Sequence, residues 1–381
     1  MDSSPPLSHT GRLLRSHALD DGAHTSDLLK NSVNRGELLR IRRGCYFPTH
    51  AWLRSPPWER HLIAAAATGV VDPAAIFCRE TALALHGVPL LHTPGAVHTR
   101  TTFNRRAGTR TGPSPTGSAS HRVLARMWED AVGVRPRGAG WMRRLQNVDA
   151  MRLQFPLTLR ESLRGGLHPD SSMRYYEALT TVAPPHGRYF DPGQVQLLAE
   201  SLPLAVLDTV GQSDFASAVV ILDAVLAGRH RGDLDYDAQS FAPWLDCLPS
   251  GRARSRWNTA LAFADALSES PGESLSRVVI AQLGFQVPTL QYEIRLHGGA
   301  HARTDFCWED AGIVGEFDGK QKYTRSRELS GDSATDVVVE ERRREHAIEQ
   351  QGYRMVRWVW HELWNADRMS ELLRNAGVPR A

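Results

Sequence analysis

Residues 303–318 read Arg303-Thr304-Asp305-Phe306-Cys307-Trp308-Glu309-Asp310-Ala311-Gly312-Ile313-Val314-Gly315-Glu316-Phe317-Asp318, which are two strand-like runs separated by a polar turn. A turn at Asp310-Ala311 predicts an antiparallel hairpin in which Asp305 lies directly opposite Glu316. Their Cβ atoms would then be ~5 Å apart on one face of the sheet. A three-residue turn would instead shift the pairing by one position and separate the two carboxylates.

Strand alternation also places Asp318 on the same face as Glu316, and Lys320 and Lys322 continue that face unless Gly319 introduces a bulge. Facing carboxylates repel unless a cation lies between them. Oxygen ligands of this kind suit Mg²⁺ or Mn²⁺ together with a substrate phosphate. With a neighbouring ammonium, the group has the parts for metal-assisted phosphodiester hydrolysis. The alternative is an ordinary surface ion-pair patch of little energy.

The elements around this hairpin follow a regular order. Ser270 begins a helix that Gly284 ends, and Gly352 ends a second helix. The expected order is α-β-β-β-α-β, made of a helix at 270–283, strands at 291–297, 302–308 and 313–318, a helix at 336–350 and a strand at 353–360.

Residues 269–364 resemble the PD-(D/E)XK nuclease superfamily, in the branch similar to very-short-patch-repair (Vsr) endonucleases, and the expected domain spans 269–381. The resemblance is carried by Glu269-Ser270-Pro271-Gly272-Glu273-Ser274, by 303–308, by Gly315-Glu316-Phe317-Asp318-Gly319 with Lys322-Tyr323, and by Gly352-Tyr353 with Val356-Arg357-Trp358-Val359-Trp360. It implies a restriction-endonuclease-like domain that uses Mg²⁺ or Mn²⁺ when active.

The resemblance also implies roles for single residues. Asp305 matches the motif aspartate, Glu316 matches the acidic residue on the next strand, and Asp318 is a further candidate metal ligand. Asp318 occupies the position where that family usually has its catalytic lysine. Lys322, which fits the branch's Asp-Gly-x-x-Lys-Tyr pattern, or Lys320, which fits the strand alternation, would have to supply the ammonium.

Glu273 has two interpretations. It resembles the helix glutamate that joins the metal site in this superfamily. Ser270-x-x-Glu273 is also a capping box, which explains the glutamate without a metal. Both interpretations are open from the sequence.

The first 100 residues combine short helical and strand patterns, including two strands at 38–47 that turn near Arg43-Gly44. Segments 35–46 (Arg-Gly-Glu-Leu-Leu-Arg-Ile-Arg-Arg-Gly-Cys-Tyr) and 82–89 (Ala-Leu-Ala-Leu-His-Gly-Val-Pro) resemble the N-terminal region of AbiEi-type antitoxins of type IV toxin–antitoxin systems. This implies a winged-helix DNA-binding region, with a basic wing made of Arg35, Arg40, Arg42 and Arg43. The alternative is a small α/β domain with solvated arginines.

Between these ends, we expect a basic Gly/Ser/Pro-rich loop or linker at 101–122 and a mostly helical connector at 123–268. The clearest helical patterns of the connector are 196–209 and 214–227. The expected class is therefore a multidomain α/β and α+β protein, with a small winged-helix-like N-terminal domain, a helical middle and an endonuclease-like C-terminal domain.

Composition limits the other classes of function. The 381 residues are 41% hydrophobic with a net charge of +3, as in a globular protein. No apolar run approaches the ~20 residues of a membrane span, and Met-Asp-Ser-Ser-Pro-Pro does not begin a signal peptide, so a cytoplasmic protein is expected. The four cysteines form no C-x-x-C pair, which favours neither a zinc site nor a disulfide framework.

The leading interpretation is a DNA-binding protein whose C-terminal domain is a Mg²⁺-dependent endonuclease. The alternative is a non-catalytic antitoxin or transcriptional regulator whose C-terminal fold only binds nucleic acid or a partner. DNA is the expected partner in the first case, and a cognate toxin is a further candidate partner in the second.

Overall fold

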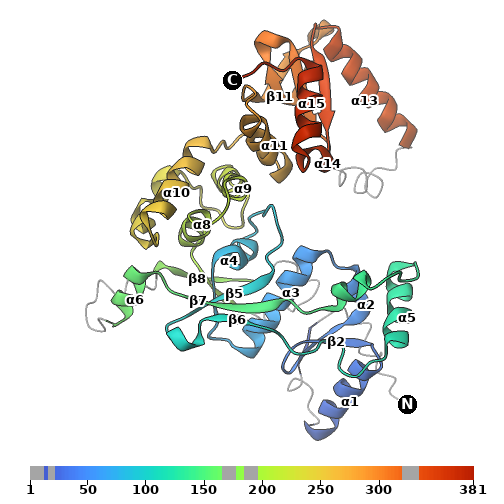
Figure 1. The fold of residues 1–381 in the computed structure, drawn as a ribbon, viewed down its shortest axis with the longest axis vertical. Coiled ribbons are helices and arrows are strands. Elements are labelled where there is room, and N and C mark those ends of the chain that lie inside the picture. Colours follow the sequence, from blue (N-terminus) through green and yellow to red (C-terminus); the bar gives the residue numbers. More distant parts are fainter. Residues whose placement is uncertain (1–12, 16–21, 165–176, 184–195, 320–333) are drawn as a thin grey trace. The chain divides into compact units, whose positions relative to one another are not determined.

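A computed structural model describes residues 13–15, 22–164, 177–183, 196–319 and 334–381. Over these residues it shows a mixed α/β and α+β protein with helices and three sheets (Figure 1). The chain divides into two compact units. The N-terminal unit comprises 1–209 and 239–254, and the C-terminal unit comprises 210–238 and 255–381.

A six-stranded sheet of order β6-β7-β5-β4-β9-β8 forms much of the N-terminal unit. Its strands are β4 (Ile76–Phe77), β5 (Ala96–Thr101), β6 (Gly108–Arg110), β7 (Asp149–Gln154), β8 (Leu179–Val182) and β9 (Leu197–Glu200). β5 pairs in parallel with β7, and β4 pairs in parallel with β9. Strands from the first 100 residues therefore share one sheet with strands of the expected helical connector, and the two segments fold together.

The basic hairpin predicted at 38–47 is confirmed. β2 (Leu38–Arg42) and β3 (Cys45–Pro48) are antiparallel, and β1 (Leu14–Arg15) pairs with β3. Gly44 turns the chain at φ +76°, where a residue without Cβ is not strained. In the chain, α1 (Gly22–Asn34) precedes β2 and α2 (Thr49–Arg54) follows β3 directly. α5 (His121–Val132) comes later.

The helices predicted for the N-terminal unit are found only in part. Besides α1, α2 and α5, the described residues form α3 (Pro57–Val71), α4 (Arg79–Leu85), α6 (Leu157–Arg164) and α8 (Leu202–Val210). α10 (Gly251–Phe263) begins in the N-terminal unit and ends in the C-terminal unit. The helix expected at 196–209 is divided into β9 and α8. Its first residues are buried strand, because β9 pairs on both sides, with β4 and with β8.

A buried ion cluster joins β5, β9 and α8. The Nε of Arg100 lies 2.6 Å from Oε1 of Glu200, and its Nη2 lies 2.5 Å from Oδ2 of Asp208. Burial raises the pKa of Glu200, although Arg100 favours its charged form. A single buried guanidinium is thus paired with two carboxylates and links β5, β9 and α8.

The C-terminal unit contains the predicted order α-β-β-β-α-β. The six elements are α11 (Pro271–Gln282), β10 (Thr289–Arg295), β11 (His301–Trp308), β12 (Ile313–Phe317), α13 (Ala334–Glu349) and β13 (Arg354–Trp358). α9 (Phe215–Leu226) precedes them, and α14 (Trp360–Leu363) and α15 (Ala366–Ala376) follow. The sheet order is β10-β11-β12-β13, with β12 and β13 parallel and the other pairs antiparallel. β12 is therefore an inner strand, and all five of its residues are buried.

Tryptophan and glycine make close packing possible beneath this sheet. Trp358 stacks on Phe306 with ring centroids 5.1 Å apart, and its Nε1 donates to Oγ of Ser276 on α11. A Cβ on Gly272 would lie 1.9 Å from the ring of Phe317, so α11 approaches the end of β12 through a residue without a side chain.

We predict that Gly272→Ala lowers the free energy of unfolding by about 1–3 kcal/mol, because its methyl group has no space beside Phe317. Gly251→Ala is the matched control, since Gly251 also lies at the start of a helix and has no atom within 4 Å of an added Cβ. Urea denaturation followed by circular dichroism measures both. Equal stability of the two variants would show that Gly272 is not packed closely against Phe317.

Candidate functional site

The hairpin register predicted from the sequence is confirmed. Phe306 pairs with Gly315, Cys307 with Val314 and Trp308 with Ile313. The turn is a short 3₁₀ segment, Glu309–Ala311, closed by Gly312 at φ +61°. Continued by one residue, this register places Asp305 on β11 opposite Glu316 on β12.

Asp305 is tied to the end of β12. Its Oδ2 accepts a hydrogen bond of 2.9 Å from the amide of Phe317, the residue after Glu316. A carboxylate that accepts a backbone N–H is held in place by that bond. Asp305 is thus oriented by the strand that carries its acidic neighbour.

Glu273 forms the helix cap that the sequence suggested. Its Oε1 accepts from the Ser270 hydroxyl at 2.8 Å, and its Oε2 accepts from the Glu269 amide at 2.8 Å. Oε2 also accepts from Nε2 of Gln291 on β10 at 3.0 Å. The capping interpretation therefore accounts for this buried glutamate, and Gln291 joins the cap to the sheet beside Asp305.

The Glu316 carboxylate is nearly buried and lies between two arginines. Its Oε1 is 2.6 Å from Nη2 of Arg344 on α13, and its Oε2 is 3.1 Å from Nε of Arg357 on β13. Arg357 also contacts Glu341 at 2.5 Å and Glu345 at 3.3 Å. Burial disfavours the charged guanidinium, but these three carboxylates outweigh it and raise the pKa of Arg357.

The remaining site candidates of the C-terminal unit are Asp318, Lys320 and Lys322. Asp318 is half-buried, and its amide donates to the carbonyl of Trp358 at 2.9 Å. Lys320 and Lys322 lie outside the described residues. Within the part of the chain that the structure describes, no group of three or more His, Cys, Asp or Glu side chains is placed to hold a metal ion.

The four arginines of the expected basic wing occupy different environments. Arg43 is exposed at the hairpin turn, and Arg35 is exposed but paired with Glu37 at 2.8 Å. Arg40 is half-buried. Arg42 is buried and donates to Oγ1 of Thr68 and to the carbonyl of Val148, so its guanidinium supports the fold instead of facing a phosphate.

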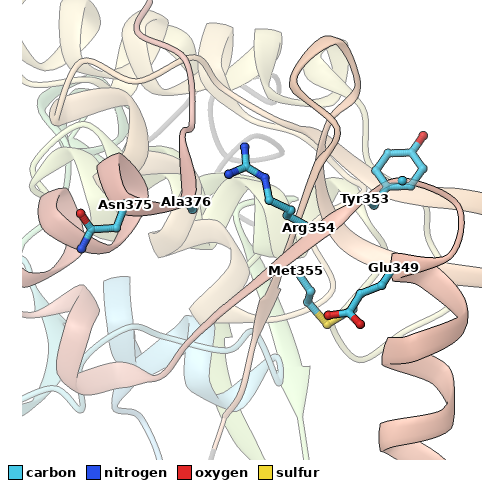
Figure 2. A pocket seen from close by; sticks show the side chains of 7 residues that line it. Glu349, Tyr353, Arg354, Met355, Asn375 and Ala376 are labelled. Atoms are coloured by element: carbon cyan, nitrogen blue, oxygen red, sulfur yellow. The ribbon is translucent and has the colours of Figure 1, made fainter.

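A pocket of about 480 Å³ lies at the other end of β13 from Glu316. Figure 2 shows the side chains that line it, which come from the end of α13, the start of β13 and the end of α15. Arg354 pairs in register with Ile313, three positions before the Arg357–Glu316 pair. The pocket is therefore separate from the carboxylate pair.

Sequence reasoning did not identify the two arginines that hold Glu316. The available signals were the position of Arg357 on a strand beside β12 and the run Glu340-Glu341-Arg342-Arg343-Arg344-Glu345 on α13. It also missed the packing of three aromatic rings, in which Trp360 contacts Phe317 on one side and Trp364 on the other.

Comparisons with known proteins add little about chemistry. No family model matches the chain. Two uncharacterized proteins of Mycobacterium tuberculosis, one from strain CDC 1551 / Oshkosh and one from strain ATCC 25618 / H37Rv, are each 35% identical to it over 98 residues. The match covers 22% of this chain and 36% of the length of each relative. No solved structure matches.

We predict that Arg357→Met lowers the free energy of unfolding by about 1–3 kcal/mol, because it leaves the nearly buried Glu316 and its acidic neighbours with less positive charge. Arg343→Met is the control, since its ion pair with Glu340 is exposed and should change stability by less than about 0.5 kcal/mol. Urea denaturation of both variants provides the measurement. Equal effects would show that the Glu316 cluster contributes no more than a surface pair.

Proposed function

We propose that this chain binds DNA and that its C-terminal unit hydrolyses DNA phosphodiester bonds with the help of Mg²⁺ or Mn²⁺. The observation that supports this most directly is the hairpin register, which pairs Phe306 with Gly315 and, if continued by one residue, would set Asp305 against Glu316 on an inner strand. The α-β-β-β-α-β order around it agrees with a PD-(D/E)XK, Vsr-like domain. This resemblance belongs to the proposal.

The chemistry of the donors fits such an ion. Mg²⁺ commonly binds through one or two carboxylates plus substrate phosphate oxygens, so a pair of protein ligands suffices. Asp305 and Glu316 would be that pair, with Asp318 and Glu273 as auxiliary ligands. When bound, the ion supplies Lewis-acid stabilisation to the phosphate under attack. Lys322 or Lys320 would polarise the attacking water.

The arginines then have a positioning role. Arg344 and Arg357 hold the Glu316 carboxylate in place. A divalent ion would be held by Asp305 and Glu316, with Arg344 and Arg357 keeping the Glu316 carboxylate oriented. A guanidinium beside such an ion would also stabilise negative charge that develops on a phosphate.

We further propose that the N-terminal unit contributes DNA affinity through an antitoxin-like winged-helix region. The exposed Arg43 at the hairpin turn is its best-placed phosphate contact, and Arg35 and Arg40 are further candidates. No described helix is long and apolar enough to cross a membrane. A cytoplasmic location, with DNA as the partner, accords with this proposal.

A second candidate function is a non-catalytic antitoxin or regulator that binds DNA or a cognate toxin. The specific observation in its favour is that both oxygens of Glu316 are paired with arginines. In that case the cluster is a structural ion network, and the C-terminal unit binds without hydrolysis.

We predict Mg²⁺-dependent nicking of supercoiled plasmid that falls by about 100-fold or more in Asp305→Asn and Glu316→Gln, because each removes a charged ligand worth several kcal/mol to the transition state. Asp305→Asn retains an oxygen for the Phe317 amide, which protects the fold. Asp310→Asn in the exposed turn is the control and should retain activity. Equal residual nicking in all four proteins would indicate a contaminating nuclease and favour the second candidate.

We predict that Arg43→Gln weakens duplex DNA binding and lowers the slope of log affinity against log salt by about 1, as expected when one phosphate contact is lost. Arg135→Gln removes an arginine of the same unit that is also exposed and should leave the slope unchanged. Fluorescence anisotropy at several salt concentrations gives both slopes. Point variants are preferable to deletion of residues 1–100, since that deletion removes strands from the six-stranded sheet.

A further inference from the structure

Gln291, within β10, has a backbone conformation that non-glycine residues rarely adopt. Its φ is +50°, in the left-handed region, where the Cβ of an L-residue crowds the backbone. Among the described non-glycine residues, Arg79 is the one other that has a positive φ. Asparagine and aspartate tolerate this region better than glutamine does, so the conformation of Gln291 has to be maintained by its surroundings.

The strained residue lies across from Asp305. β10 and β11 pair on either side of it, through Leu290 with Phe306 and Tyr292 with Thr304. Gln291 and Asp305 are the residues between these two pairs, and the ladder does not join them. All other residues of β10 are paired. The irregularity of this strand is therefore confined to the position that faces the proposed metal ligand.

The Gln291 side chain is directed to a buried carboxylate on α11. Its Nε2 donates to Oε2 of Glu273 at 3.0 Å, and Glu273 is 5% exposed. The capping box of α11 is complete without this bond, because the Ser270 hydroxyl and the Glu269 amide already donate to the two oxygens of Glu273. Gln291 thus adds a link from the start of the helix to the sheet, which the cap does not require.

The contacts of Gln291 form a closed series around Asp305. Gly272, next to Glu273, lies so close to the ring of Phe317 that a Cβ would be 1.9 Å from it. The amide of Phe317 donates to Oδ2 of Asp305 at 2.9 Å. Asp305 lies across from Gln291, whose amide returns to Glu273. A displacement of Gln291 would therefore be transmitted to the strand end that holds the Asp305 carboxylate.

Protection of the sheet edge is a simpler role for the same irregularity. β10 is an outer strand of its sheet, and an interrupted edge strand pairs poorly with a second chain. That role needs only the backbone and leaves the choice of side chain open. The bond from Gln291 to buried Glu273 uses the side chain, which favours a role that depends on the amide.

We propose that Gln291 is a positioning residue of the proposed hydrolytic site. Through Glu273 it fixes the start of α11, and with it the Asp305 carboxylate that would bind the divalent ion. This inference rests on the proposed function and adds a residue that contacts neither the ion nor the substrate. Hydrogen-bond partners of this kind set metal affinity, because they hold the ligands in the arrangement that the ion requires.

The test measures Mn²⁺ binding to the full chain by electron paramagnetic resonance, in which free Mn²⁺ gives a signal that binding removes. Gln291→Gly removes the amide and relaxes the backbone. Its Mn²⁺ affinity should fall about 10- to 100-fold, the range found when a partner behind a metal ligand is lost. Its melting temperature should stay close to that of wild type, because release of strain offsets the lost hydrogen bond.

Two further single variants separate the amide from the backbone. Gln291→Asn keeps a residue that tolerates the left-handed region but is one methylene too short to reach Glu273, so it should bind Mn²⁺ as weakly as Gln291→Gly. Gln286→Gly makes the same change at an exposed glutamine that precedes β10 and should bind as wild type does. An equal loss of affinity in Gln286→Gly would overturn the inference.

A double variant tests whether Gln291 acts through Glu273. Glu273→Ala removes the acceptor and should itself weaken Mn²⁺ binding. Adding Gln291→Gly to it should then cause little further loss, because residues that act through one contact have non-additive effects. Losses that simply add would overturn the inference. A thermal melt of each variant verifies folding, and a loss of affinity seen only in variants with a lowered melting temperature would also overturn it.

The outcomes distinguish this inference from the proposed hydrolysis. Wild-type Mn²⁺ affinity in Gln291→Gly would overturn the positioning role, even if plasmid nicking depends on Asp305 and Glu316, and would leave edge protection as the role of the irregular strand. Conversely, Gln291-dependent Mn²⁺ binding without any Mg²⁺-dependent nicking would support the positioning role while rejecting hydrolysis. Absence of Mn²⁺ binding by the wild-type protein would overturn both.

Discussion

The compensation of Glu316 by Arg344 and Arg357 is the interaction on which the C-terminal unit most depends. A carboxylate on an inner strand loses most of its water, and an unpaired charge there would be strongly unfavourable. The two guanidiniums come from α13 and β13, so satisfying one charge connects the helix to the parallel strand pair. The same carboxylate is the one that the proposed reaction needs, and structural and chemical requirements therefore meet at a single side chain.

The same solution appears elsewhere in the chain. Arg277 donates to Asp223 and to the carbonyl of Phe263, which joins α11 to α9 within the C-terminal unit. Arg100 does this for two carboxylates in the N-terminal unit. Arginine suits these positions because its planar guanidinium donates in several directions and stays charged when buried. Part of the arginine content of this chain thus serves the interior and is unavailable for nucleic acid, as Arg42 illustrates.

Local patterns were sufficient for much of the fold. The β2–β3 hairpin followed from Arg43-Gly44 between two apolar runs, and the β11–β12 register followed from the length of the polar turn. The pattern at 196–209 was misleading because apolar residues buried on both faces of a strand resemble a buried helix. The division near residue 100 also differs from the structure, since parallel pairing of β5 with β7 joins segments that no local pattern connects.

The sequence by itself determined the order of elements in the C-terminal unit and the β11–β12 register, because each depends on residues close together in the chain. It offered the helix cap at Ser270 and Glu273 as one of two interpretations, and the structure shows the cap. Only the tertiary structure decided which cations face Glu316, which of the four wing arginines is buried, and that Phe317, Trp360 and Trp364 form one packed series. The physical reason is that these contacts, apart from the Trp360–Trp364 stack, join residues about 28 to 106 positions apart. Such pairs are selected by packing and by the charge balance of the interior, which spacing along the chain does not encode.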